Sequence, residues 1–170
     1  ELVGDWRDLL QASREKKNES YLRKWKTWNH EMVYDVILFA LRTGMRKGEI
    51  SALRMDSVDF DGGLITVESS FSFKEDVRKK TTKNKSYRRV EMNPEVRAIL
   101  EQHKDRETDF RPFEVIMRSH TIKRFSELTK RAGILEIHFH ALRHTFLTNI
   151  ANGYGMAEPV PLLQVMKIAG

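Results

Sequence analysis

The sequence contains no cysteine in its 170 residues. Disulfide bonds, thiolate zinc sites and cysteine nucleophiles are therefore excluded. A long apolar run is also missing: the longest, from Val36 to Leu41, is much too short to span a bilayer. No signal peptide is visible, and the chain opens with Glu1 rather than methionine. We therefore expect a fragment of a larger intracellular protein with no membrane segment.

Several catalytic motifs are missing as well. The chain has no Gly-x-Ser-x-Gly and no Gly-x-x-x-x-Gly-Lys-Ser/Thr, which argues against a serine hydrolase and a nucleotide-phosphate loop. His140 and His144 have the i, i+4 spacing of a zinc-binding helix. However, Ala141 stands where the metalloprotease motif has glutamate, and Arg143 would place a fixed cation beside the ion. We therefore predict no metal site.

Positive charge is concentrated in one segment. Residues 74–89 contain eight lysines and arginines but only two carboxylates, which accounts for the whole net charge of +6. A local basic patch on an otherwise neutral chain is typical of a surface that binds a polyanion. A solvated loop that keeps the protein soluble would explain the same composition.

Hydrophobic spacing predicts one domain, residues 1–170, of the α+β class, predominantly helical with a small three-stranded antiparallel sheet. A strand over residues 64–68 is expected to pair with strands over 77–80 and 87–92, which a polar turn at 81–86 connects. Residues 113–117 are apolar, but their pattern does not decide between helix and strand. Helices are expected at residues 5–15, from 29 to Gly44, around 46–53, from the cap at Asn93-Pro94, from the cap at Thr121 to near Gly133, from 140 to about 152, and after Pro159.

The segment from His140 to Phe146 places several cations at the expected start of a helix. In a helix, His140, Arg143 and His144 share one face, whereas Leu142 and Phe146 point into the core. A helix start that presents cations is suited to an anion, and phosphate is the obvious candidate.

Other isolated cations occupy special places in the chain. Arg46 follows the helix-ending glycine, and Lys83 or Lys85 lies at the tip of the expected hairpin. Arginine offers a planar set of donors that matches phosphate oxygens, and a lysine on a turn can give a proton to a leaving oxygen. With His140 and Arg143 they could hold one phosphodiester. Taken singly, Arg46 could be a surface or ion-paired arginine, and His140 a core histidine.

Three segments match the conserved boxes of a known family in the right order. Residues 43–53 (TGMRKGEISAL) and 140–146 (HALRHTF) resemble the two arginine boxes of the tyrosine recombinases, the phage-type integrases. Residues 82–90 (TKNKSYRRV) resemble the lysine-bearing β-turn of that family. The resemblance covers the chain from about residue 30 to its end, and it implies the catalytic fold of these enzymes.

The resemblance implies roles for individual residues. Arg46 and Arg143 would clamp the scissile phosphate and stabilise the negative charge of the pentacoordinate transition state. His140 would bind the phosphate and donate or accept a proton. Lys83, preferred to Lys85 because of its distance from the strand that follows, would protonate the departing 5′ oxygen. Further residues have supporting or DNA-binding roles: Glu49 would brace Arg46, His144 would be a hydrogen-bond partner, and Lys79, Lys80, Lys85 and Arg88 would contact DNA.

The activity implied is site-specific DNA recombination, the integration or excision of a phage or mobile element. It would proceed through a covalent 3′-phosphotyrosyl intermediate without a metal or nucleotide cofactor. The partner would be double-stranded DNA in a bacterial cytoplasm, bound by a tetrameric synapse of the intact protein and by a monomer of this chain. One alternative is a non-catalytic DNA-binding module on the same scaffold. Another is a type IB topoisomerase or telomere resolvase, although both arginine boxes look like those of integrases.

The tyrosine nucleophile of the family has no counterpart among the four tyrosines. Tyr154 is the only tyrosine after the second box, but it follows Arg143 too closely and lies in a Gly-Tyr-Gly loop; Tyr21, Tyr34 and Tyr87 precede that box. The last residues, Ile168 to Gly170, resemble the start of the next box and stop one residue before its histidine. We therefore expect this chain to lack the tyrosine segment and the N-terminal DNA-binding domain, and to bind DNA without cutting it.

Overall fold

The computed structural model describes residues 30–79, 87–118, 125–131, 133, 137–154 and 158–169. The helix predicted over residues 5–15, the turn predicted at 81–86 and the cap predicted at Thr121 lie outside these residues, as do Lys80, Lys83 and Lys85. The α+β class with a predominance of helix is confirmed. The described elements are α3 (His30–Thr43), α4 (Lys47–Ala52), the 3-10 helix η1 (Met55–Ser57), β1 (Val58–Asp59), β2 (Leu64–Val67), β3 (Ser70–Ser72), β4 (Val77–Lys79), β5 (Arg88–Glu91), α5 (Pro94–Glu101), α6 (Glu114–Arg118), α8 (Phe125–Arg131), α9 (His140–Asn152) and α10 (Leu162–Ala169).

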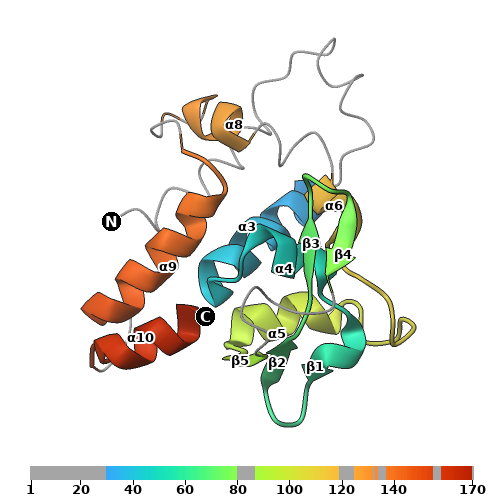
Figure 1. Cartoon of the computed structure of the whole chain (residues 1–170), viewed down its shortest axis with the longest axis horizontal. Coiled ribbons are helices and arrows are strands. Elements are labelled where there is room, and N and C mark those ends of the chain that lie inside the picture. Colours follow the sequence, from blue (N-terminus) through green and yellow to red (C-terminus); the bar gives the residue numbers. More distant parts are fainter. Residues whose placement is uncertain are drawn as a thin grey trace.

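Helix α3 lies at the centre of the described structure and contacts α5, α6 and α9 (Figure 1). Its apolar residues recur at three- and four-residue spacing, which places them on one face. Val33, Val36, Ile37 and Ala40 are accordingly buried. The end of α3, at Thr43, therefore has a fixed position between the helices on one side and the sheet on the other.

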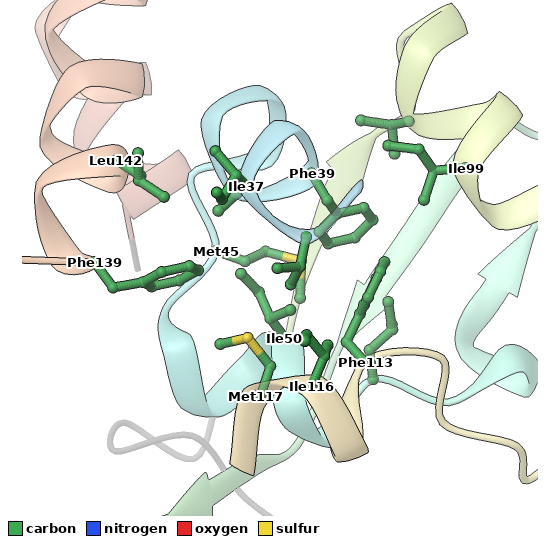
Figure 2. Packing of buried hydrophobic residues seen from close by; sticks show 14 of the residues in the cluster. Ile37, Phe39, Met45, Ile50, Ile99, Phe113, Ile116, Met117, Phe139 and Leu142 are labelled. Atoms are coloured by element: carbon green, nitrogen blue, oxygen red, sulfur yellow. The ribbon is translucent and has the colours of Figure 1, made fainter. Parts of the chain in front are cut away.

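The hydrophobic core joins α3 to α4, α5, α6 and α9. The rings of Phe39 and Phe113 meet with their centroids 4.6 Å apart, and Figure 2 shows Ile50 from α4 close by. Phe139 and Leu142 extend the same cluster from the start of α9. The first turn of α9 is thus packed against the end of α3, which brings the two predicted arginine boxes together.

Strand β2 is the middle strand of a three-stranded antiparallel sheet of order β1-β2-β5. Ile65 lies opposite Val90 and Val67 opposite Arg88. Ile65, Val67 and Val90 are buried, so one face of the sheet covers the core. The predicted pairing of residues 64–68 with residues 87–92 is confirmed.

Strand β4 does not pair as predicted. We expected residues 77–80 to join the sheet beside residues 64–68, whereas Val77–Lys79 pairs with Ser70–Ser72 in a separate two-stranded hairpin. All three residues of β4 are exposed, including its one apolar side chain, Val77, so this strand contributes nothing to the core. The turn before it, which includes Asp76 at a φ of +55°, instead allows pairing with the nearest strand in sequence.

Helix ends follow the local signals. The Asn93 side chain accepts a hydrogen bond from the backbone N–H of Val96 at 2.8 Å and caps α5, and Gly153, with a φ of +73°, ends α9. Residues 113–117, whose type the sequence pattern did not decide, lie largely in α6. No helix in the described part of the chain is long and apolar enough to cross a membrane.

Gly44 ends α3 with a φ of +59°, a conformation that other residues adopt only with strain. The ring of Phe146 from α9 covers this glycine. A Cβ atom on residue 44 would lie 2.2 Å from Cδ1 of Phe146. Both the backbone conformation and the contact with α9 therefore require glycine at this position.

We expect Gly44→Ala to lower the free energy of unfolding by about 2–4 kcal/mol, from backbone strain plus displacement of the Phe146 ring. Gly63 is the matched control, because its φ is +66° and no atom lies within 4 Å of the position a Cβ would take. Gly63→Ala should cost only the strain, about 1–2 kcal/mol. Urea denaturation of both variants gives the comparison, and equal losses would show that the Phe146 contact contributes nothing.

Candidate functional site

Arg46 occupies the junction between α3 and α4. It is the N-cap residue of α4, and its backbone N–H donates to Oε2 of Glu49 at 2.7 Å. Its Nη1 donates to Oε1 of the same carboxylate at 3.0 Å. The predicted contact between Glu49 and Arg46 is therefore present. With its side chain 43% exposed, Arg46 is held at its base and reaches the surface.

Helix α4, which carries this pair, packs closely on strand β3. A Cβ atom on Gly48 would lie 2.5 Å from the carbonyl oxygen of Phe71. The absence of a side chain at residue 48 thus allows the backbones of α4 and β3 to approach each other. This contact fixes the helix turn on which Arg46 and Glu49 lie.

Glu49 is almost completely buried, with 2% exposure, and it also forms an ion pair with an arginine from the sheet. Arg88 of β5 donates from Nη1 to Oε1 at 2.8 Å and from Nη2 to Oε2 at 2.6 Å. Burial by itself raises the pKa of Glu49. The hydrogen bonds and charge of Arg88, together with the hydrogen bonds from Arg46, more than offset this and hold the pKa below its ordinary value of 4.5.

Arg143 lies in the first turn of α9 and is 6% exposed. Its Nη1 donates to the carbonyl oxygen of Gly44 at 2.5 Å, and its Nη2 donates to the carbonyl oxygen of Ala169 at the end of α10. Figure 1 shows the end of α10 beside the end of α3. Burial, followed by the charge of Arg46, lowers the pKa of Arg143 to about 10. The guanidinium therefore stays charged at neutral pH.

His140 and His144 lie one turn apart on α9, and both are exposed. Their rings meet edge to face with centroids 4.8 Å apart. Partial burial lowers the pKa of His140, and the charges of His144, Arg143 and Arg46 lower it further. The ordinary pKa of histidine is 6.5, so His140 is neutral at pH 7 and can accept a proton.

These contacts assemble one cationic site from the two boxes. Arg46 affects the pKa values of both His140 and Arg143, so the three groups lie within electrostatic range of one another. Arg46 and His140 reach the surface there, while Arg143 is held by backbone carbonyls. The arrangement can bind an anion and accept a proton beside it. Among the described residues, no group of three histidine, cysteine, aspartate or glutamate side chains could hold a metal ion.

The predicted DNA-contacting cations that the structure describes, Lys79 and Arg88, differ in exposure. Lys79 is on the exposed hairpin, 52% exposed and paired with Glu75 at 2.7 Å. Arg88, by contrast, is 12% exposed and directs both terminal nitrogens to Glu49, so its predicted contact with DNA stays a prediction. Strand alternation was the signal that could have revealed this low exposure, because Arg88 shares a face with the apolar Val90. Lys80, Lys83 and Lys85 lie outside the described residues.

Comparisons with known proteins identify similar structures. A family model described as the phage integrase family matches residues 5–166. The integrase of the Tn1549 transposon, solved in complex with transposon right-end DNA, has a TM-score of 0.65 at 20% identity, covering 91% of this chain and 56% of that one. The XerA recombinase has a TM-score of 0.50 at 20% identity, covering 96% of this chain and 56% of that one. A search of curated protein sequences found no match.

A second structure of the Tn1549 integrase, with a circular-intermediate DNA, has a TM-score of 0.59 at 20% identity and covers 96% of this chain. This chain spans 56% of the length of each of these solved chains. At this level of identity the similarity shows a shared fold.

Proposed function

The chain belongs to the phage integrase family, and we propose that it is the phosphate-binding part of the catalytic domain of a tyrosine site-specific recombinase. Its reaction would be the integration or excision of a mobile element through a 3′-phosphotyrosyl intermediate. One observation carries the proposal: Arg143 of α9 donates to the carbonyl oxygen of Gly44, two residues before Arg46, and the charge of Arg46 lowers the pKa of both Arg143 and His140. The similar Tn1549 integrase was solved in complex with DNA, which supports double-stranded DNA as the partner.

In this proposal the two arginines stabilise the transferring phosphoryl group. The pentacoordinate transition state carries more negative charge on its equatorial oxygens than the ground state does. Donors already fixed in place before the reaction lower the barrier without having to reorganise. Arg143 is fixed by two backbone carbonyls and Arg46 by Glu49, which supports these roles.

His140 would move the proton of the attacking hydroxyl. Partial burial, followed by the charges of His144, Arg143 and Arg46, lowers the pKa of His140. Its imidazole is therefore neutral at pH 7 and can accept that proton as the new bond to phosphorus forms. Protonation of the leaving 5′ oxygen falls to Lys83 in this proposal, on the basis of the family resemblance. Glu49 and His144 have supporting roles, the first through Arg46 and the second through its ring contact with His140.

The nucleophilic tyrosine is not one of the described tyrosines in this proposal. Tyr34 lies ten residues before Gly44 on α3, about 15 Å away along the helix axis. Tyr87 and Tyr154 are exposed, at 70% and 66%, but neither has the family's position relative to Arg143. We therefore propose that residues 1–170 form one domain that, on its own, binds DNA as a monomer and does not cut it, whereas the intact recombinase acts as a tetramer.

A ligation reaction tests the site without needing that tyrosine. The substrate is a nicked duplex whose 3′ end carries a p-nitrophenyl phosphate ester next to a free 5′-hydroxyl, with randomised flanking sequence. Attack of the 5′ oxygen on phosphorus restores the phosphodiester and p-nitrophenolate leaves. Because this step reverses the departure of the 5′ oxygen, Lys83 would take the hydroxyl proton. We expect protein-dependent ligation, measured by gel and by sequencing the joined strands.

The alternative, a non-catalytic DNA-binding module, makes a different prediction for the same assay. It would bind the nicked duplex but join no strands above the rate without protein, across the whole randomised library. The absence of an assigned tyrosine favours this alternative, and the fixed, charged arginines favour the enzyme. Ligation that depends on Arg46 decides for the enzyme.

DNA affinity should fall steeply as the salt concentration rises, because cations of the β3–β4 hairpin would displace counterions from the DNA phosphates. Lys79 is exposed on β4, and Lys79→Met should flatten the slope of log affinity against log salt by about 0.9. Lys104→Met, on the segment after α5 where Lys104 lies over the Phe60 ring, is the charge-matched control and should leave the slope unchanged. Fluorescence anisotropy across a salt series measures both. Equal slopes for the two variants would place the hairpin outside the interface.

A further inference from the structure

The carboxylate of Glu49 is shared by two arginines from different elements. Four donors converge on it: the backbone N–H and Nη1 of Arg46, and Nη1 and Nη2 of Arg88. Each carboxylate oxygen accepts from both residues, at 2.6–3.0 Å. Since Glu49 is 2% exposed, water does not compete for these bonds, and the carboxylate links the sheet to the α3–α4 junction.

Arg88 shares the charge of the buried Glu49 carboxylate and so reduces how tightly that carboxylate holds the Arg46 side chain. A buried carboxylate with one cationic partner would hold that partner in a tight, fully paired contact, because an unpaired buried charge is costly. Arg88 of β5 provides a two-bond ion pair that neutralises Glu49 by itself. Arg46 gives Glu49 its backbone N–H and Nη1, and its side chain remains 43% exposed.

The sheet places Arg88 for this task. Arg88 pairs across the ladder with Val67 of β2, and Val90, two residues on, is buried at 7% exposure. Strand alternation turns Arg88 to the covered face and Arg89 to the exposed one. The guanidinium of Arg88 is therefore positioned by a packed strand rather than by a flexible loop.

We propose that Arg88 is a positioning residue for the phosphate-binding Arg46, acts through Glu49, and is not a DNA contact. The inference rests on the proposed function for the reaction that Arg46 serves. In the absence of Arg88, Glu49 draws the Arg46 guanidinium inward and away from the phosphate. A displacement of this kind, of about 1 Å, typically costs up to 10² in rate.

The ligation assay at saturating DNA tests this inference with three variants. Arg88→Met is expected to lower the ligation rate by about 10–100-fold with little change in DNA affinity. Arg88→Lys keeps one charge and one bond, and should recover part of the rate. Arg89→Met removes the same charge from the exposed face of the same strand, and its rate at saturation should stay within about threefold of the unchanged chain.

The pH profile separates positioning from a purely structural role. The charged groups that face Glu49 are Arg46 of its own turn, Arg88 from β5 and Arg143 from α9. Without Arg88 the pKa of Glu49 rises, because burial is then opposed by fewer donors. Arg88→Met should therefore show an additional acidic limb in its rate profile, beyond any limb from His140 that both proteins share, as protonation of Glu49 releases the backbone and side chain of Arg46.

A double variant checks for simple destabilisation. Arg88→Met with Glu49→Gln removes the uncompensated buried charge, so its melting temperature should recover towards that of the unchanged chain. Its rate should remain at least about tenfold low, because Arg46 has lost its charged acceptor. Recovery of the rate together with stability would overturn the inference, since Arg88 would then only stabilise the fold.

The outcomes also distinguish this inference from the proposed function. If the unchanged chain ligates and Arg88→Met ligates at the same rate and pH dependence, the positioning role is wrong and the function stands. If Arg88→Met flattens the salt slope by as much as Lys79→Met, Arg88 contacts DNA and the inference is also overturned. If the unchanged chain joins no strands, the proposed function is the one that fails. The ion pair between Arg88 and Glu49 can then still be followed by thermal denaturation. Arg88→Met must lower the melting temperature more than Arg89→Met does.

Discussion

Arg143→Ala is expected to lower the rate of strand ligation by about 10²–10³-fold at saturating DNA. Arg143 contributes a charge that burial does not remove, since its pKa of about 10 keeps it protonated well above neutral pH. Its two bonds to the carbonyls of Gly44 and Ala169 fix its position before DNA arrives. Alanine removes both the donor and that fixed geometry.

Arg143→Lys distinguishes catalysis from folding. Lysine keeps the charge but cannot donate in a planar pair, so it should retain one carbonyl bond and most of the stability. We expect its rate to stay at least about tenfold low while its melting temperature approaches that of the unchanged chain. Single-turnover ligation and thermal denaturation measure the two quantities. A lysine variant with full activity would show that charge alone, rather than the arginine geometry, serves the phosphate.

Glu49→Ala is expected to lower the free energy of unfolding by about 3–5 kcal/mol, because it leaves Arg88 buried without a partner. For a chain of this size the melting temperature should fall by about 10 °C. Glu95→Ala is the matched control: Glu95 also pairs with an arginine, Arg42, but its side chain is 40% exposed. Exposed ion pairs contribute little, so that variant should lose less than about 1 kcal/mol.

The difference in unfolding free energy between Glu49→Ala and the unchanged chain should depend on pH in a definite direction. The pKa of Glu49 in the folded protein lies below its ordinary value of 4.5. The stability that Glu49 contributes is therefore complete above pH 4.5 and is lost as the pH falls through the lower, folded value. The gap in unfolding free energy between Glu49→Ala and the unchanged chain should narrow over that acidic range. A gap that stays constant with pH would mean that the ionised carboxylate is not what stabilises the fold.

Local signals in the sequence predicted the parts of the site that depend on near neighbours. Gly44 was recognised as a helix end, and Glu49 was expected to brace Arg46, because both relations act over three or four residues. The grouping of His140, Arg143 and His144 on one face likewise follows from helix periodicity. These features are set by short-range geometry, which a sequence pattern expresses directly.

The parts that the sequence did not predict depend on contacts between distant elements. Strand β2 takes the distant β5 as its partner, whereas β4, with all three residues exposed, pairs only with its sequence neighbour β3. The partner of Arg88 is 39 residues away, so composition placed it with the DNA-facing cations of its neighbourhood. A charge run on a strand has two faces, and only one of them lies on the surface.

The bond between Arg143 and the carbonyl of Gly44 joins residues 99 positions apart, and this separation governs when the site can form. As the chain is synthesised from its N-terminus, Arg46, Glu49 and then Arg88 emerge well before α9 does. The network around Glu49 can close early, at modest loop entropy, whereas the arginine of α9 joins only after a much longer loop has closed. The Arg143 side of the anion site is therefore absent from the nascent chain until α9 has been synthesised and packed against the end of α3.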